Sequence, residues 1–344
     1  MRKSSEIPEN MKNGQPTIID VARLAGVAVS TASMALNGNV AIKATTREKV
    51  QKAADTLRYV PNQVARSLLG QKTFSIGALQ WPSLNPLHTE NSLQLMKFAA
   101  QRNYHFRLFW NDIHRPESIK PLIQTIRGSV DGIILYNPSH LETQKLLIDQ
   151  LRNCRTAFIF SSYIDEPSVD FVAPDVRSGA RMAMEYLLAK GHREIATFAG
   201  SGYSPCDRGI AETLEKYGLE FHPDCRITQT VEDYRGAYEI SMKLLKRKSA
   251  PTAVFVRSDF VALTLIRAAC DLGMKVGKDL EVISMDNTEQ GAYYVPSLTT
   301  VGFDRQEKNR LLLDILMQRI GGESMPPQQI YIKPELILRE STIN

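Results

Sequence analysis

Long hydrophobic runs are missing from this 344-residue sequence. No stretch approaches the roughly 18 consecutive apolar residues that a membrane-spanning helix needs, and the N-terminal region contains no apolar segment of the signal-peptide kind. With 43% hydrophobic and 23% charged residues, the composition lies near the globular average, which excludes collagen-like, coiled-coil and wholly disordered chains. We therefore expect a cytoplasmic globular protein that is neither exported nor embedded in a membrane.

Signatures of metal binding and catalysis are equally scarce. The four cysteines are far apart, with no CxxC pair and no histidine at metal-ligand spacing, which predicts neither a disulfide framework nor a zinc site. The sequence contains no GxGxxG, GxxxxGK(S/T), GxSxG or HExxH pattern, so the usual phosphate-binding and hydrolytic motifs are missing. We expect no cofactor and no metal, and an enzyme is the weakest functional hypothesis.

Positive charge is concentrated at the N-terminal end. Residues 1–72 contain eleven Lys and Arg against five Asp and Glu, a net charge of +6, whereas residues 73–344 carry −1. The length is enough for two or three folded units, at roughly 100 to 200 residues each. A small basic unit on a near-neutral body is typical of a nucleic-acid-binding module joined to a second function. A solvated basic tail is the alternative that charge alone leaves open.

The basic unit has the pattern of a helix-turn-helix. Residues 1–16 are polar and aperiodic, so we expect a disordered tail. Thr17 and Asp20 form a candidate capping box for a first helix that Gly26 ends. Small and apolar residues then recur where two short helices can cross closely, at Val21, Ala22, Ala25, Val27, Ala32 and Ala35. A third helix, opened by Thr45, completes a domain that we place at residues 17–60.

The second helix, at about residues 29–36, is the predicted recognition helix in the major groove. The candidate DNA contacts in this domain are Thr17, Val29, Ser30, Thr31, Ser33, Met34 and Asn37. Ser30 can form hydrogen bonds to bases or phosphates, whereas Val29 and Met34 offer apolar surface to a thymine methyl group. Because no Arg, Lys, Asn or Gln precedes Asn37 on this helix, we expect much of the affinity to come from phosphate contacts and DNA shape. The alternative is that Met34 packs in the core of this domain.

Residues 61–73 are predicted to form a hinge helix and linker. Asn62 is a candidate N-cap and Gly70 a candidate stop, which leaves a helix of barely two turns. So short a helix is marginal alone in water, and we expect it to order only against DNA together with its own copy in a dimer. Leu68 can insert between base pairs in the minor groove and kink the duplex. Alternatively, it can pack as a core residue against the helix-turn-helix domain.

From residue 74 onward, short apolar runs alternate with helical stretches. Among these runs are residues 75–80, 132–136, 253–256 and 281–286. The alternation predicts an α/β body of parallel sheets covered by helices, and residues 74–344 are enough for two such lobes. Because α/β sheets bind ligands beyond the carboxyl ends of their strands, the cleft between the lobes is the candidate ligand site.

Taken in order, several segments resemble the LacI/GalR family of bacterial transcription regulators over residues 17–342. These segments are TIIDVARLAGVAVSTASMALNG, YVPNQVARSLLG, VDGIIL, GARMAMEYLLAKGHREIA, VISMDN and PELILREST. The resemblance implies a helix-turn-helix head, a hinge helix at residues 62–69, and a two-lobed body similar to periplasmic sugar-binding proteins. It also implies a homodimer on a palindromic operator, with Leu68 at the family's minor-groove position and Ala65 beside it. The resemblance therefore favours insertion of Leu68 into the minor groove over its packing as a core residue.

The resemblance further implies an effector pocket between the lobes. By alignment, the candidate effector contacts are Trp81, Asn85, Ser161, Arg208, Ser258, Asp286 and Arg305. Asp286 stands where relatives hold a sugar hydroxyl, and Trp81 can either stack on a sugar ring or pack at the rim. The effector implied is small and polar, a sugar or a sugar derivative.

Some positions depart from the family pattern. Cys206 aligns with an arginine that relatives place before a Gly-aromatic pair, with Arg208 nearby on a different helical face, and Ser258 replaces the usual asparagine. Ala28 stands where a serine usually caps the recognition helix, and Met34 replaces an Arg or His that reads guanine. These differences leave three alternatives to a repressor with an effector: a regulator with a degenerate pocket, a ligand-binding module without a specific operator, and an enzyme of the cleft.

Overall fold

The computed structural model describes residues 16–36, 41–59, 72–80, 85–110, 116–136, 141–154, 156–198, 204–220, 223–228 and 233–342. Five of the predicted site residues lie outside these ranges, namely Asn37, Asn62, Ala65, Leu68 and Trp81. The chain forms two compact units, residues 1–73 and 74–344. Within the described ranges no single helix is long and apolar enough to cross a membrane. Helices α1 (Ile18–Ala25) and α2 (Val29–Leu36) pass that test only as a pair, bent by 101°.

Three short helices build the first unit, with α3 (Ala44–Leu57) packed against both α1 and α2. Their shared core consists of Val21, Ala22, Ala32, Ala35, Val50, Ala53 and Ala54. As predicted, the carboxylate of Asp20 accepts hydrogen bonds from the backbone N–H (2.9 Å) and hydroxyl (2.7 Å) of Thr17. Gly26 ends α1 in the left-handed conformation, at a φ of 67°. The small side chains allow the close crossing that a helix-turn-helix requires.

The predicted start of the third helix was wrong. Thr45 was expected to cap it, but the helix begins at Ala44, and the N-cap position belongs to Lys43. The carbonyl oxygen of Lys43 accepts the N–H groups of Thr46 and Arg47, both at 3.0 Å, and this fixes the first turn. The side chain of Lys43 makes no capping hydrogen bond, so the backbone alone opens the helix.

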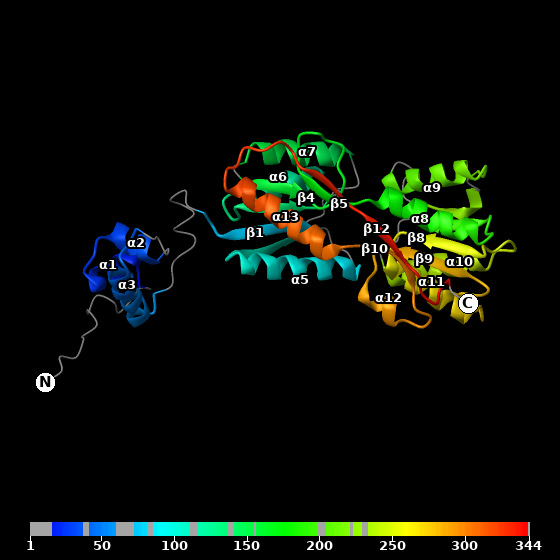
Figure 1. Ribbon diagram of the computed structural model, residues 1–344, viewed down its shortest axis with the longest axis horizontal. Coiled ribbons are helices and arrows are strands. Elements are labelled where there is room, and N and C mark those ends of the chain that lie inside the picture. The colour runs from blue at the N-terminus through cyan, green and yellow to red at the C-terminus, as the bar shows by residue number, and fades with distance from the viewer. Residues whose placement is uncertain are drawn as a thin grey trace. The chain divides into compact units, whose positions relative to one another are not determined.

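The second unit is the two-lobed α/β body that the sequence predicted (Figure 1). The first lobe contains a sheet with the order β11-β5-β4-β3-β1-β2, in which neighbouring strands are parallel. Its strands are β1 (Ser75–Gln80), β2 (His105–Trp110), β3 (Gly132–Leu135), β4 (Ala157–Phe160), β5 (Phe171–Pro174) and β11 (Gln329–Ile332). Its helices are α5 (Pro86–Gln101), α6 (Pro116–Ile126), α7 (Leu141–Arg152) and α13 (Arg305–Ile320).

Both faces of this sheet are covered. Ile133 and Leu135 of β3 pack among residues of α6 and α7, whereas Ile134 packs among residues of α5 and α13. The four residues of β3 are therefore all buried, as expected for a parallel strand between two helical layers. Polar side chains can leave such a sheet only where its strands end, and this places the functional groups at the carboxyl edge.

The second lobe repeats this plan, with the order β12-β10-β9-β8-β6-β7 and only β12 antiparallel to its neighbour among these pairs. Its strands are β6 (Ile195–Phe198), β7 (Arg226–Ile227), β8 (Ala253–Val256), β9 (Glu281–Met285), β10 (Thr299–Phe303) and β12 (Pro334–Ile337). Its helices are α8 (Val176–Ala189), α9 (Pro205–Lys216), α10 (Tyr234–Leu245), α11 (Asp259–Asp271) and α12 (Glu289–Tyr293), with a short 3-10 turn at Pro223–Cys225. Helices α8 and α9 cover one face and α10 and α11 the other.

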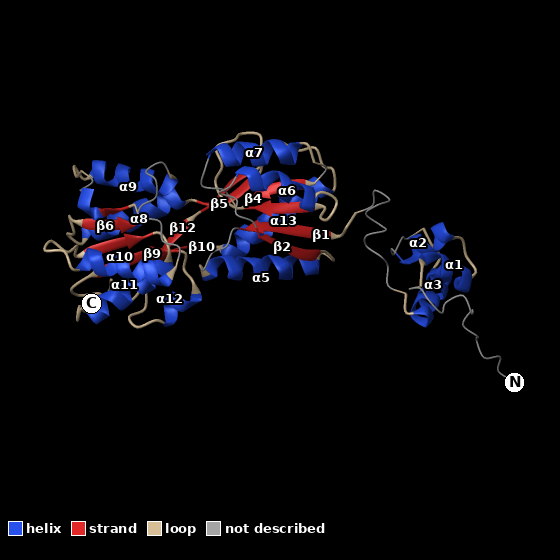
Figure 2. Cartoon of the chain, turned by 180° about the vertical axis from the view of Figure 1, so that it is seen from behind, coloured by secondary structure: helices blue, strands red, loops and turns tan. Residues whose placement is uncertain are grey.

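The chain passes between the lobes three times (Figure 2). It leaves the first lobe between β5 and α8, returns between β10 and α13, and leaves again between β11 and β12. The last passage is a single residue, Lys333. The lobes are thus joined by short segments of backbone at one side, which is an arrangement that permits hinge motion.

One buried carboxylate holds the loop that follows β9. Asp259, at the start of α11, is fully buried and accepts hydrogen bonds from the hydroxyl groups of Ser284, Thr288 (2.8 Å) and Thr300 (2.9 Å). It also accepts the backbone N–H of Thr288 at 2.6 Å. The loop between Ser284 and Thr288 contains Asp286 at a φ of 139°, a backbone conformation that needs support from its surroundings.

Asp259→Ala should therefore destabilise the body strongly. The substitution leaves several buried donors without an acceptor, which we expect to lower the free energy of unfolding by about 3 to 5 kcal/mol. Urea unfolding followed by circular dichroism measures this loss. Asp149→Ala, at an exposed position on α7, is the matched control and should change stability by less than about 0.5 kcal/mol. Equal stability of the two variants would contradict this role for Asp259.

Candidate functional site

Helix α2, the predicted recognition helix, presents its predicted contacts away from the core of the first unit. Ala32 and Ala35 of α2 are buried, whereas Val29 is 43% and Met34 is 38% exposed. Of the other predicted contacts, Thr17 and Ser30 are exposed and Thr31 and Ser33 are half-buried. Met34 is thus a surface residue, which excludes the alternative that it is core. The face of α2 opposite the core is available to bind an external partner.

The body has its own candidate site where the two lobes meet. Asn85 caps the first helix of the first lobe, α5, by accepting the N–H of Leu87 at 3.0 Å. Its amide nitrogen Nδ2 lies 3.2 Å from Ser258 Oγ and 3.2 Å from Asp286 Oδ2, both in the second lobe. Ser258 follows β8 and Asp286 follows β9, so two strand ends of one lobe meet a helix start of the other. Three predicted effector contacts therefore converge.

Arg305 joins the same site from the start of α13. Its guanidinium forms an ion pair with Glu90 of α5 at 2.7 Å, and it donates to the backbone oxygen of Asn287 at 3.1 Å. Asn287 belongs to the second lobe, so Arg305 also links the lobes. We call the set Asn85, Glu90, Ser258, Asp286, Asn287 and Arg305 the inter-lobe junction.

Ser161 lies beside α13 and contacts Lys308, which is not among the predicted effector contacts. Ser161 directly follows β4, is 3% exposed, and its Oγ accepts a hydrogen bond from Lys308 Nζ at 3.1 Å. Lys308 is itself buried on α13, one turn beyond Arg305. The sequence does indicate that Lys308 is buried, because it lies four residues before Leu312 and eight before Leu316 on the same face of the helix.

Further polar groups end the neighbouring strands of the first lobe. Gln80 is the last residue of β1 and Tyr136 follows β3, and both are buried. The ring of His88 lies 5.5 Å from that of Tyr136 in an edge-on arrangement. Burial and the nearby charge of Lys308 lower the pKa of His88 to about 4, and burial raises the pKa of Tyr136 to about 12. These groups are therefore neutral at pH 7.

Burial also shifts the charged groups of the site. It raises the pKa of Asp286 to about 8, reinforced by the nearby Asp259 and opposed by hydrogen bonds from Asn85 and Ser258. It lowers the pKa of Lys308 to about 8, reinforced by the charge of Arg305 and opposed by Asp286. Both pKa shifts disfavour the charged form of the group. This is expected when a titratable group is removed from water and its hydrogen bonds and ion pairs do not fully replace its hydration.

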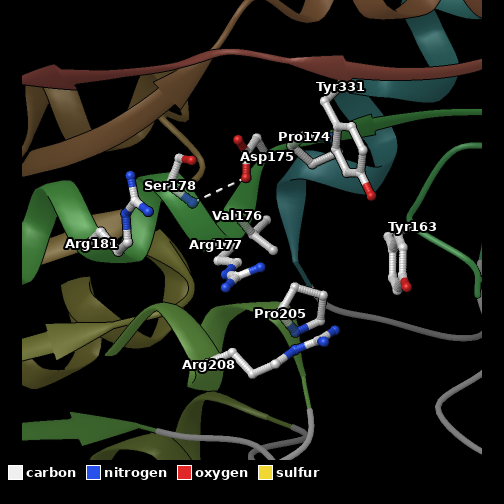
Figure 3. A pocket seen from close by; sticks show the side chains of 10 residues that line it. All are labelled: Tyr163, Pro174, Asp175, Val176, Arg177, Ser178, Arg181, Pro205, Arg208 and Tyr331. Atoms are coloured by element: carbon white, nitrogen blue, oxygen red, sulfur yellow. Dashed lines mark hydrogen bonds between the residues drawn. The ribbon is translucent and has the colours of Figure 1, made fainter. Parts of the chain in front are cut away.

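Arg208 lies apart from the other predicted effector contacts. It lines a different pocket of about 440 Å³, together with Tyr163, Pro174, Asp175, Val176, Arg177, Ser178, Arg181, Pro205 and Tyr331 (Figure 3). Arg177 forms an ion pair there with Glu212, and the Asp175 side chain caps α8 at 3.0 Å from Ser178 N. Glu212 is close enough to all three arginines for their charges to lower its pKa.

Cys206 belongs to the interior. It packs in the core between α8 and α9, and burial raises the pKa of its thiol to about 12. Three residues further along α9, Gly209 lies so close to α8 that an added Cβ would clash with the backbone oxygen of Arg177. The tight contact of these helices explains why the side chain at position 206 points into the core rather than toward a ligand.

Comparisons with known proteins place both units. Residues 17–62 match the model of bacterial regulatory proteins of the lacI family, and residues 184–342 match a periplasmic binding protein-like domain. The HTH-type transcriptional repressor PurR of Pasteurella multocida is 30% identical over 335 residues, covering 94% of this chain and 98% of the relative.

Solved structures agree with this likeness over nearly the whole chain. The lac repressor dimer bound to operator and the anti-inducer ONPF superposes with a TM-score of 0.82 at 25% identity, covering 96% of this chain and 100% of that one. The complex of the transcriptional regulator CelR with cellobiose has a TM-score of 0.69 at 25% identity, with coverage of 95% and 99%. The chain therefore belongs to the LacI family of bacterial DNA-binding transcription regulators.

Proposed function

We propose that this protein is a repressor that acts on DNA in the cytoplasm. In this proposal it binds a palindromic operator as a homodimer and responds to a small polar effector, a sugar or a sugar derivative, at the inter-lobe junction. The observation that carries the proposal is the presence in one chain of an exposed recognition helix and a polar junction built from both lobes. The cellobiose complex of CelR supports a sugar as the class of effector.

The junction offers a physical route for control. Asn85 and Arg305 each reach from the first lobe to groups of the second, so a ligand that replaces these contacts changes how the lobes hold together. A coupling free energy of about 1 to 3 kcal/mol between ligand and operator corresponds to 5-fold to 150-fold control of operator affinity. The hydroxyl and amide groups of the junction suit the hydroxyl groups of a polar ligand.

A second copy of the chain is the proposed occupant of an apolar side of the body. Leu93 and Met96 of α5 are 50% and 45% exposed, and Tyr293 and Val295 at the end of α12 are 82% and 84% exposed. Helices α5 and α12 both lie at the lower edge of the body as it is drawn in Figure 1. Exposed large apolar residues are typical of an interface. The lac repressor structure, which is similar over nearly the whole chain, is that of a dimer bound to operator.

Selection of duplexes from a random DNA library by the full-length protein tests this proposal. We expect the recovered sequences to share a palindrome, because a two-fold symmetric dimer reads two equivalent half-sites. Recovery of random sequences with only salt-dependent affinity would contradict it. That result would favour the ligand-binding module without a specific operator.

Met34→Arg should change the recovered palindrome at one position of each half-site. Arginine can bond to O6 and N7 of guanine, which methionine cannot, so we expect a shift toward guanine by about 1 to 3 kcal/mol. The head should stay folded because Met34 is already 38% exposed. Leu24→Arg, on α1 and 51% exposed, adds the same charge as a control and should leave the preferred bases unchanged. Identical palindromes from the wild type and Met34→Arg would remove Met34 from the base contacts.

Tyr293→Asp should weaken the dimer. A carboxylate buried in the interface without a partner costs several kcal/mol, so we expect sedimentation velocity to detect monomer at micromolar concentration and operator affinity to fall at least tenfold. Tyr217→Asp, at the C-cap of α9, is the matched control; this tyrosine is 40% exposed, and the variant should remain dimeric. A Tyr293→Asp variant as dimeric as the control would show that the interface lies elsewhere.

A further inference from the structure

A buried ammonium group without a carboxylate partner lies next to the inter-lobe junction. Lys308 is 7% exposed, and its Nζ donates a hydrogen bond to Ser161 Oγ at 3.1 Å. Among the residues that the structure describes, no carboxylate oxygen lies within 4.0 Å of this nitrogen. Lysine is almost never this buried in proteins unless its charge is paired. The missing partner is therefore the feature that needs an explanation.

The position of Lys308 is that of a ligand-binding group. It lies in the first turn of α13, three residues after Arg305, so the two side chains share a face of the helix. Its hydrogen-bond partner Ser161 follows β4, and Gln80 and Tyr136 end the neighbouring strands β1 and β3. Ligands of α/β sheets bind at this carboxyl edge. Lys308 thus lies among neutral polar groups at the edge where a ligand is expected.

The other charges of the site do not compensate it. Glu90 is already paired with Arg305 at 2.7 Å. Asp286 shares the amide of Asn85 with Ser258, and burial and the nearby Asp259 raise its pKa, which favours its neutral form. Burial lowers the pKa of Lys308, and the charge of Asp286 only partly opposes this shift. Among the described residues, the ammonium of Lys308 therefore has a hydroxyl group as its hydrogen-bond partner and no carboxylate within ion-pair distance.

We propose that the effector is a polyhydroxylated molecule with an anionic group, a carboxylate or a phosphate, and that Lys308 binds this group. Asn85, Ser258 and Asp286 then receive the hydroxyl groups from the side of the second lobe. This inference rests on the proposed effector function of the junction. It adds the charge of the ligand, which decides whether a neutral sugar or its acid derivative controls the protein.

Matched pairs of probes test the charge of the ligand on the full-length dimer. Isothermal titration at pH 7 compares glucose with glucuronate and glucose 6-phosphate, galactose with galacturonate, and ribose with ribose 5-phosphate. We expect at least one acid to bind 30-fold or more tightly than its neutral partner. The carboxylate and phosphate members of the panel distinguish the two anionic groups. Binding of neutral sugars alone, or of no member of the panel, would overturn the proposal.

Lys308→Met tests whether this residue carries the preference, with Lys120→Met on the exposed face of α6 as the control. We expect Lys308→Met to weaken binding of the acid at least 100-fold and Lys120→Met to leave it unchanged. Without ligand, Lys308→Met should melt at a higher temperature than the wild type, because it removes a buried charge that nothing pairs. A lower melting temperature would assign Lys308 a structural role and overturn the proposal.

Operator binding by the same samples distinguishes a wrong charge of the effector from a wrong regulatory function. If the wild type selects a palindromic operator, a failure of the acid panel concerns only the charge of the effector. If the wild type binds no operator, the proposed regulatory function itself fails, whatever ligand the junction holds.

Discussion

The hydrogen bonds of Asn85 are the contact on which the proposed regulation depends. A single amide nitrogen reaches Ser258 and Asp286 in the opposite lobe, while the amide oxygen of the same side chain caps α5. The N-terminus of α5 in the first lobe is thereby bonded to residues that follow two strands of the second lobe. A ligand that competes for this amide acts on the start of α5 and on the angle between the lobes at the same time. Regulation by such a site needs only a modest difference in affinity between two lobe arrangements.

The rigidity behind this contact comes from the second lobe. Asp259 holds Ser284 and Thr288 from the buried side, and Asp286, midway between these two residues, faces Asn85. The two carboxylates have opposite roles set by their surroundings. Asp259 accepts several hydrogen bonds and is a structural anchor, whereas burial and the charge of Asp259 raise the pKa of Asp286, which Asn85 and Ser258 contact. A polar ligand at the junction can exchange hydrogen bonds with this carboxyl group.

Much of this organisation was predictable from the sequence, and the exceptions have physical reasons. The apolar runs of β1, β3, β8 and β9 predicted strands because they are buried on both faces, and the Ala22 and Ala32 pattern predicted the crossing of α1 and α2. The apolar-run pattern did not predict β5, β11 or β12, which have only four residues each and either begin or end in proline or lie half-exposed. No local pattern distinguishes such strands from loops, because tertiary pairing holds them.

The candidate site was predictable in parts. Asn85, Ser258, Asp286 and Arg305 do converge, since each lies at an edge that the α/β plan brings together. Arg208 lines another pocket, because Cys206 and Gly209 turn α9 so that its arginine faces away. The spacing of Lys308 to Leu312 and Leu316 predicts burial but no role in a site. Its availability to a ligand follows only from its surroundings, where no carboxylate of the described residues forms an ion pair with it.

Operator affinity of Asn85→Ser tests the central claim most directly. Serine still caps α5 but lacks the amide N–H that reaches Ser258 and Asp286, so this link between the lobes is lost, while the link through Arg305 and the DNA-binding unit are unchanged. We predict that fluorescence anisotropy on the selected operator will show at least a fivefold change in the affinity of the ligand-free dimer, with unchanged affinity for random duplex. Wild-type operator affinity in this variant, with the body folded, would contradict control of DNA binding through the inter-lobe junction.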